Sequence, residues 1–159
     1  SYERCRTEAR LPLKDAAGRL KFVWSEPTVA RLPEGRLIML LRFDETGWLY
    51  ASFSEDEGMS WSHPVRTHIP NPSNKVRLIS AGDGRLALLH TPNPVHGMAH
   101  RNPLAVWLSG DGLRTWEKKI LWDLDGWISY PDGFVEDGML YLSCELNRHD
   151  VYFLRERIF

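Results

Sequence analysis

Short apolar runs separated by turn-forming residues repeat along most of the chain, and this pattern predicts β-strands. A strand is expected where a few aliphatic or aromatic residues are bounded by Gly, Pro, Asn or Asp. Little of the sequence has the hydrophobic period of an amphipathic helix. The strands are predicted near 27–32, 36–43, 48–54, 62–67, 76–80, 84–90, 103–109, 117–122, 131–135, 139–145 and 150–157.

Three of the predicted turns share one pattern, in which an acidic residue and a glycine lie between two apolar runs. These turns are PEGRL at 33–37, GDGRL at 82–86 and EDGML at 136–140. An acidic residue followed by glycine between alternating hydrophobic positions is a strong hairpin signal. The chain is therefore expected to repeat one hairpin-based unit three times.

A second repeated stretch reads SEDEGMSW at 54–61 and SGDGLRTW at 109–116, each after an apolar run. Self-similarity at this period is typical of stacked structural repeats. The residues expected to build the two turns are Ser54, Asp56, Gly58 and Trp61 in the first copy and Ser109, Asp111, Gly112 and Trp116 in the second. Aspartate accepts hydrogen bonds from backbone amides, and glycine tolerates a positive φ. The glycine lies one position earlier in the second copy, which predicts a slightly different turn.

Together these signals predict three antiparallel sheets, near 26–68, 75–122 and 128–159, with the last lacking its outermost strand. Four-stranded sheets repeated radially form a β-propeller, which typically has four to eight blades. Three blades are therefore expected to be the C-terminal part of a longer propeller, or a half that forms a homo-oligomer. Residues 1–24 are expected to be a separate segment with one strand at 20–24.

Composition and charge narrow the classes of partner. The 159 residues are 43% hydrophobic and 26% charged, with a net charge of −1. A near-neutral chain is a poor candidate for nucleic-acid binding, which needs a basic surplus. No window approaches the ~20 apolar residues of a membrane helix, and residues 1–24 lack a hydrophobic signal core; the compartment stays open. Cys5 and Cys144 predict either one bridge or two inert thiols.

The repeated turn resembles the aspartate box of sialidases, and four further residues extend that resemblance. Glu26 opens EPTV, Arg42 ends LIMLLR, Arg101 lies in HRNPL, and Tyr130 lies in ISYPD. Their order and blade positions resemble the second half of a sialidase active site. The resemblance covers the chain from about residue 25 to its end, and it implies an all-β, six-bladed propeller with a central site for an acidic sugar.

The resemblance implies a role for each of these residues. Tyr130 would be the nucleophile and Glu26 its base, while Arg42 and Arg101 would bind the sugar carboxylate. A phenol suits this substrate because a carboxylate nucleophile would be repelled by the sugar's own carboxylate, and sialidases are known exceptions to the paired-carboxylate scheme. Tyrosine needs such a base because its ordinary pKa is ~10, and the arginine fork matches a carboxylate.

The sequence also contains other polar residues whose roles can be predicted. Asn71 and Asn102 are expected to bind substrate, and 147–150 is expected to be a solvated turn. His96 and His100 have a spacing that suits a metal only on a helix, and Gly97 with its flanking prolines disfavours a helix. No metal or cofactor is therefore expected.

The resemblance also leaves parts of a sialidase site unaccounted for. A third arginine and an acid/base aspartate are expected upstream, and this chain alone is expected to be inactive. Three alternatives stay open: a non-catalytic carbohydrate-binding propeller, another sugar-acid enzyme such as a lyase or uronic-acid glycosidase, and a scaffold that binds protein at its rim.

Overall fold

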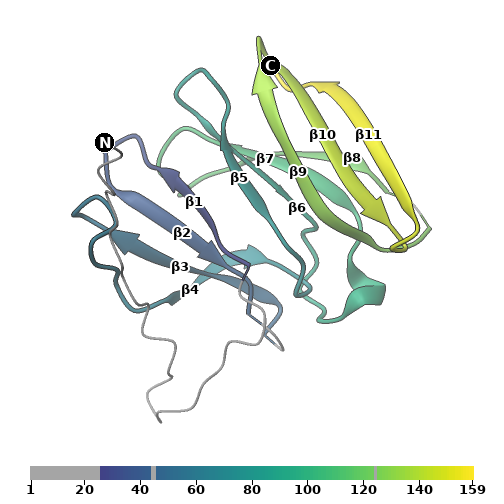
Figure 1. The fold of residues 1–159 in the computed structure, drawn as a ribbon, viewed down its shortest axis with the longest axis horizontal. Coiled ribbons are helices and arrows are strands. Elements are labelled where there is room, and N and C mark those ends of the chain that lie inside the picture. The colour runs from purple at the N-terminus through teal and green to yellow at the C-terminus, as the bar shows by residue number, and fades with distance from the viewer. Residues whose placement is uncertain (1–25, 44–45, 124) are drawn as a thin grey trace, which may run out of the picture.

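The computed structural model describes residues 26–43, 46–123 and 125–159, in which eleven strands form three antiparallel sheets (Figure 1). The first sheet contains β1 (Thr28–Arg31), β2 (Leu37–Leu41), β3 (Trp48–Ser54) and β4 (Val65–Pro70). The second contains β5 (Arg77–Ser80), β6 (Leu86–His90), β7 (Leu104–Ser109) and β8 (Glu117–Trp122). The third contains β9 (Ile128–Glu136), β10 (Met139–Leu146) and β11 (Asp150–Arg157). The predicted all-β fold is confirmed, while the strand expected at 20–24 and Cys5 lie outside the described residues.

The second sheet is covered on both faces, and its sequence shows why. Every residue of β6 and β7 is buried, and both strands read as near-continuous apolar runs, as expected for strands packed on two sides. One hydrophobic cluster fills the space toward the first sheet and includes Leu40 and Leu88. A second cluster lies toward the third sheet and includes Leu89 and Leu140. The two cores stack the three sheets face to face.

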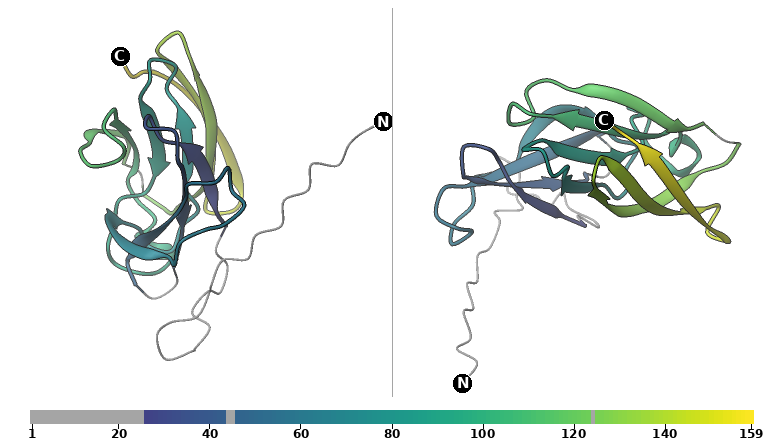
Figure 2. Two further views of the ribbon diagram at one scale, coloured as in Figure 1. Left: turned by 90° about the vertical axis from the view of Figure 1, so that its left-hand side faces the viewer. Right: turned by 90° about the horizontal axis from the view of Figure 1, so that it is seen from above.

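The first strands of the three sheets lie side by side: β1 contacts β5, and β5 contacts β9. The Leu78 amide on β5 donates to Thr28 Oγ1 on β1 at 3.1 Å. From this inner row each sheet extends outward, so the molecule has the layout of consecutive propeller blades (Figure 2). Segments that enter the inner strands are therefore brought together at one end of the molecule.

The two aspartate-box turns are built alike, although the glycine is shifted between them. In the first, Ser54 Oγ donates to Asp56 Oδ1 at 2.8 Å and accepts from the Gly58 amide at 2.8 Å. In the second, Ser109 Oγ donates to an Asp111 oxygen at 2.9 Å and accepts from the Leu113 amide at 3.0 Å.

The backbone explains why the shifted glycine is tolerated. Both turns need two consecutive residues with positive φ, and these are Glu57 (58°) with Gly58 (87°) and Gly112 (75°) with Leu113 (69°). Glycine fills the second position in one copy and the first in the other. The expected slight difference between the turns is confirmed elsewhere: the Met59 amide donates to the Asp56 carbonyl at 3.2 Å, whereas the corresponding Arg114 amide donates to Asp111 Oδ1 at 3.0 Å.

The tryptophans of the two boxes are used differently. Trp61 Nε1 donates to the carbonyl of Gly58 at 3.1 Å, so its ring closes its own turn. Trp116 instead packs beside Trp107, with ring centroids 5.8 Å apart, next to the core between the first two sheets.

Three features were checked within the described residues: a metal site, a membrane-spanning helix and a reactive or bridged cysteine. No group of three or more His, Cys, Asp or Glu side chains there is arranged to hold a metal ion. None of the helices in that part of the chain has the length and apolar character needed to cross a bilayer. Cys144 is a buried free thiol, and burial raises its pKa to about 11, which keeps it protonated and unreactive.

The fully buried His90 should make stability depend on pH. Its ring stands edge-on to Trp107 at 4.4 Å, and neither ring nitrogen has a hydrogen-bond partner among the described residues. Burial lowers the pKa of His90 to about 3 from its ordinary 6.5, and the charge of Lys118 acts in the same direction. The Pro70 carbonyl opposes this shift, but it does not meet hydrogen-bond geometry with the ring.

We therefore expect acid to destabilise the fold through His90. The unfolded chain takes up a proton below pH 6.5 and the folded chain does not, so this contribution is complete above 6.5 and is lost progressively toward pH 3. Between pH 7 and 5 the loss should be about 2 kcal/mol, measured by urea unfolding at each pH. His90→Phe should flatten the curve in this window, and an unchanged slope would contradict the assignment.

Candidate functional site

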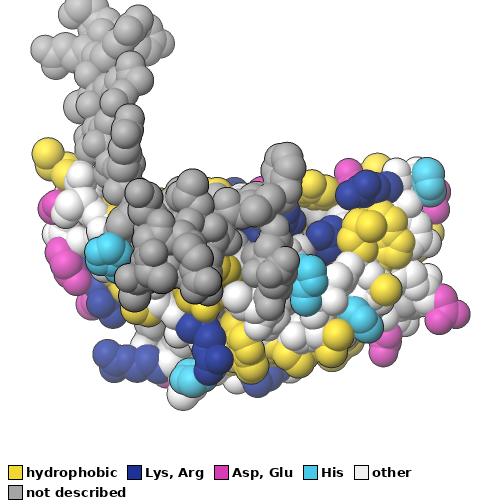
Figure 3. Space-filling view, turned by 90° about the horizontal axis from the view of Figure 1, so that it is seen from below, with side chains coloured by type: hydrophobic (Ala, Val, Ile, Leu, Met, Phe, Trp, Pro, Cys, Tyr) yellow, Lys and Arg dark blue, Asp and Glu magenta, His cyan; other side chains and the backbone are white. Residues whose placement is uncertain are grey.

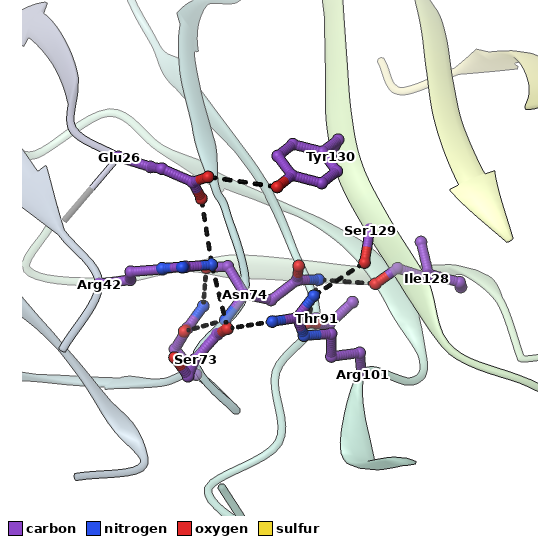
Figure 4. Close-up of polar contacts among 10 residues, drawn as sticks. Glu26, Arg42, Ser73, Asn74, Thr91, Arg101, Ile128, Ser129 and Tyr130 are labelled. Atoms are coloured by element: carbon purple, nitrogen blue, oxygen red, sulfur yellow. Dashed lines mark hydrogen bonds and ion pairs between the residues drawn. The ribbon is translucent and has the colours of Figure 1, made fainter. Parts of the chain in front are cut away.

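The four residues that carry the resemblance lie around one hollow of about 570 Å³ at the end of the inner strands. Glu26 precedes β1, Arg42 follows β2, Arg101 follows the short 3₁₀ turn Met98–His100, and Tyr130 lies in β9. All three sheets therefore border the hollow. The predicted proximity of a phenol, a carboxylate and two guanidinium groups is present in the structure (Figure 4).

Tyr130 is directed toward the hollow by an irregularity in its strand. Two residues of β9, Tyr130 and Pro131, lie opposite the single residue Cys144 of β10, where the strand register shifts. Such a bulge changes the direction of a side chain and is common beside active sites. Because the bulge continues the pairing, β9 begins at Ile128 rather than near 131 as predicted.

The Tyr130 hydroxyl donates to Glu26 Oε1 at 3.3 Å. Both residues have a positive φ, 52° for the tyrosine and 31° for the glutamate. Such backbone conformations cost roughly 1–3 kcal/mol each and are found preferentially at functional sites. The rest of the fold thus holds this pair together against local preference.

Arg42 extends the pair into a chain of three charged or polar groups. Its side chain is buried, and Nη1 lies 3.1 Å from Glu26 Oε2 and 3.3 Å from the Ser73 carbonyl. The two oxygens of one carboxylate therefore face different partners, the phenol and the guanidinium. This arrangement orients the carboxylate toward the tyrosine.

Arg101 is held beside Arg42 by a shared backbone oxygen. Its Nη2 donates to the Ser73 carbonyl at 2.7 Å and its Nη1 to Ser129 Oγ at 2.9 Å. Ser73 has a φ of 64°, which turns this carbonyl toward both arginines. Burial, followed by repulsion from Arg42, lowers the pKa of Arg101. Two cations held this close favour an anionic ligand, which would offset their repulsion.

Arg148 also lines the hollow, and sequence reasoning missed it. The stretch 147–150 was expected to be a solvated turn, and the arginine is indeed exposed, but the turn lies at the mouth of the hollow. A signal for this was present: antiparallel pairing sets the end of β10 beside the start of β9, where Tyr130 lies.

Asn71 and Asn102 do not line this hollow. The Asn71 side chain accepts from the Asn74 amide at 2.8 Å and donates to the Asn74 carbonyl at 3.1 Å. Asn74 Nδ2 in turn donates to the Ile128 carbonyl at 2.8 Å, at the start of β9. Asn102 Nδ2 donates to Asp123 Oδ1 at 2.7 Å. Both amides are engaged within the protein, and their binding of substrate stays a prediction.

The lining of the hollow is electrostatically one-sided. Among the described residues of the lining, Arg42, Arg101 and Arg148 contribute three positive charges against the carboxylate of Glu26. The view from below looks onto the end of the molecule where β9 starts, and several basic and histidine side chains lie on that face (Figure 3). The charge of the lining is thus suited to an anionic ligand.

Known proteins share this fold. The family model described as a BNR repeat-like domain matches residues 20–142. Among solved structures, the Hadza microbial sialidase Hz136 is 18% identical with a TM-score of 0.67, and the match covers 83% of this chain and 27% of that one. The Trypanosoma rangeli sialidase in complex with the inhibitor DANA is 21% identical with a TM-score of 0.60, covering 81% of this chain and 22% of that one.

A third similar structure is the Penicillium chrysogenum alpha-L-arabinanase complexed with arabinobiose. It is 16% identical with a TM-score of 0.60, and the match covers 85% of this chain and 46% of that one. Glycoside hydrolases thus use this scaffold, and the chain spans about a quarter of the two sialidases and under half of the arabinanase. No curated protein matches the sequence.

Proposed function

Because the chain belongs to the family of BNR repeat-like domains, we propose that it forms part of a glycoside hydrolase that removes a terminal acidic sugar of the sialic acid class. The observation that carries the proposal is the Tyr130 hydroxyl bonded to Glu26, beside two adjacent arginines. The blades near 26–68, 75–122 and 128–159 would belong to a larger ring. Its other blades would come from the same protein or from a second copy.

In the proposed reaction the sugar carboxylate is bound by Arg42 and Arg101 through parallel hydrogen bonds. Tyr130 Oη forms a bond to the anomeric carbon as the bond to the leaving-group oxygen breaks, and Glu26 takes the phenol proton. A general acid from a blade outside this chain would protonate the leaving group, which typically contributes about 10²–10⁴-fold. Water would then release the sugar from the tyrosine and give its proton to the conjugate base of that acid, while the tyrosine regains a proton from the glutamate.

The charge of the hollow favours this substrate class over a neutral sugar. An arabinan chain carries no anionic group and would bring no negative charge to balance Arg101, which lies beside Arg42 and its ion-pair partner Glu26. Removing charge from water without a counter-charge is costly, so a site for neutral sugars would gain nothing from Arg101 beside Arg42. The charge of the hollow does not exclude a uronic-acid glycosidase, because the substrates of such an enzyme also carry a carboxylate.

The experiment is turnover by the full-length protein, with a fluorogenic sialoside, a glucuronide and an arabinofuranoside compared side by side. We expect turnover of the sialoside alone, and a loss of about 10²-fold in kcat/KM in Arg101→Gln, since removing one partner of a charge pair that the bound sugar shields from water costs ~2–5 kcal/mol. Arg77→Gln is the matched control, because Arg77 pairs with Asp132 outside the hollow.

The other outcomes separate the alternatives. Binding of the sialoside without turnover would identify a non-catalytic carbohydrate-binding propeller. Release of an unsaturated sugar would identify a lyase. Turnover of the arabinofuranoside alone, unaffected by Arg101→Gln, would overturn the proposal.

A further inference from the structure

Arg148 is presented to the hollow by a turn that is pinned to its surroundings. The turn joins β10 to β11, and both Asn147 (φ 54°) and Arg148 (φ 60°) have left-handed backbones. The Asn147 amide donates to the Trp127 carbonyl at 3.0 Å, and Asn147 Oδ1 accepts from the Trp127 amide at 3.0 Å. This reciprocal pair of hydrogen bonds fixes where the arginine side chain starts.

The guanidinium group of Arg148 lies 5.5 Å from the centre of the Trp127 ring. No acidic side chain in the described part of the chain forms an ion pair with it. A guanidinium held over an aromatic ring keeps its N–H donors available at the ring edge. The turn and the Trp127 ring therefore hold the Arg148 guanidinium in position, with its N–H donors available to a ligand or to water.

The three arginines of the hollow differ in depth. Arg42 is buried with 9% exposure, Arg101 is half-buried, and Arg148 is exposed. Their charges also differ in pairing, because Glu26 is the one carboxylate among the described residues that line the hollow, and it pairs with Arg42. These lining residues thus have a surplus of two positive charges, the half-buried Arg101 and the exposed Arg148.

We propose that Arg148 recognises a second anionic group of the ligand, located outward of the carboxylate held by Arg42 and Arg101. This inference rests on the proposed function and narrows its substrate class. The preferred glycan carries an acidic terminal sugar joined to another anionic sugar, so that two negative charges meet the two surplus positive ones. A ligand with one carboxylate would leave the outer cation unmatched.

The test uses two substrates that differ in one charge. One is a disialylated lactose, and the other is the same compound with the penultimate carboxylate converted to a neutral methylamide. In the full-length protein we expect Arg148→Gln to lower kcat/KM for the first substrate about 10-fold, and for the second less than about 2-fold, as for loss of one charged hydrogen bond. Added salt should shrink the difference between the substrates.

Arg66→Gln is the matched control. Arg66 is another exposed arginine over a tryptophan, 5.4 Å from the ring of Trp48, but it does not line the hollow. It should affect neither substrate. If kcat/KM for each substrate were the same in Arg148→Gln as in the unmodified protein, this inference alone would be overturned. If the unmodified protein cleaved neither substrate, the proposed function and this inference would be overturned together.

Discussion

Tyr130→Phe in the full-length protein is expected to lower sialoside turnover by about 10³-fold or more, the usual scale for removing a nucleophile. Phenylalanine lacks the oxygen that would attack the anomeric carbon, and the Glu26 carboxylate would lose the proton donor 3.3 Å away. The fold should not change, because the ring is 41% exposed and phenylalanine meets the same backbone strain at φ 52°. The measurements are kcat/KM and the thermal unfolding midpoint.

Tyr141→Phe is the control for Tyr130→Phe. Tyr141 lies in the same sheet and stacks on Phe134, with centroids 5.1 Å apart, outside the hollow. It should retain full turnover. If Tyr130→Phe kept more than a tenth of the activity, the tyrosine would not be the nucleophile, and only an anion-binding role for the hollow would survive.

The second large effect is expected at Gly47, in the connection between β2 and β3. An added Cβ would lie 2.0 Å from the Pro94 carbonyl oxygen, and the residue has a φ of +73°. Both the clash with backbone and the left-handed conformation act against Gly47→Ala, so we expect a loss of about 3 kcal/mol or more in the free energy of unfolding. Urea unfolding measures this loss directly.

Gly84→Ala separates the two causes at Gly47. Gly84 has a similar φ of +86°, but an added Cβ would meet nothing within 4 Å. It should cost only about 1 kcal/mol, the backbone contribution alone. Equal losses in the two variants would mean that the contact between Gly47 and Pro94 is not tight.

Through its contact with Pro94, Gly47 also supports a segment that lines the hollow. Pro94 belongs to the segment between β6 and β7 that supplies His96, Gly97 and Met98 to the lining of the hollow. Gly47 accepts a hydrogen bond from the Asn71 amide at 2.9 Å, and the Gly97 amide donates to the Pro72 carbonyl at 3.2 Å. The first blade and the rim of the second therefore support one wall of the hollow together.

Much of the fold was predictable because its causes are local. Hairpins at 33–37, 82–86 and 136–140 follow from neighbouring residues, and the two aspartate boxes close through hydrogen bonds that span only a few positions. The start of β9 was predicted too late because a bulge depends on the partner strand. Likewise, Leu113 adopts the positive φ of Gly58, its equivalent in the first aspartate box, because the hydrogen bonds of the box outweigh the cost of that backbone conformation for a residue other than glycine.

The sequence alone was enough to name the types of residue in the site. That these residues lie together could be predicted only from the resemblance to a known family. Glu26 and Tyr130 lie 104 positions apart, and no local pattern joins them. Ser73 organises both arginines through its carbonyl oxygen, a backbone role that the type of residue does not indicate. Asn71, whose binding of substrate stays a prediction, holds Asn74, which anchors the start of the strand that bears the tyrosine.

The amino-acid sequence by itself determined the strands, the repeated turns and the all-β class, because hydrophobic alternation and turn chemistry act over a few residues. Tertiary packing decided which side chains meet, since the stacking of three sheets sets the inner strands side by side and closes contacts over long stretches of chain. It also decided that Arg148 lies at the mouth of the hollow. An isolated turn presents that arginine to water, and only the neighbouring blade provides the other wall of the site.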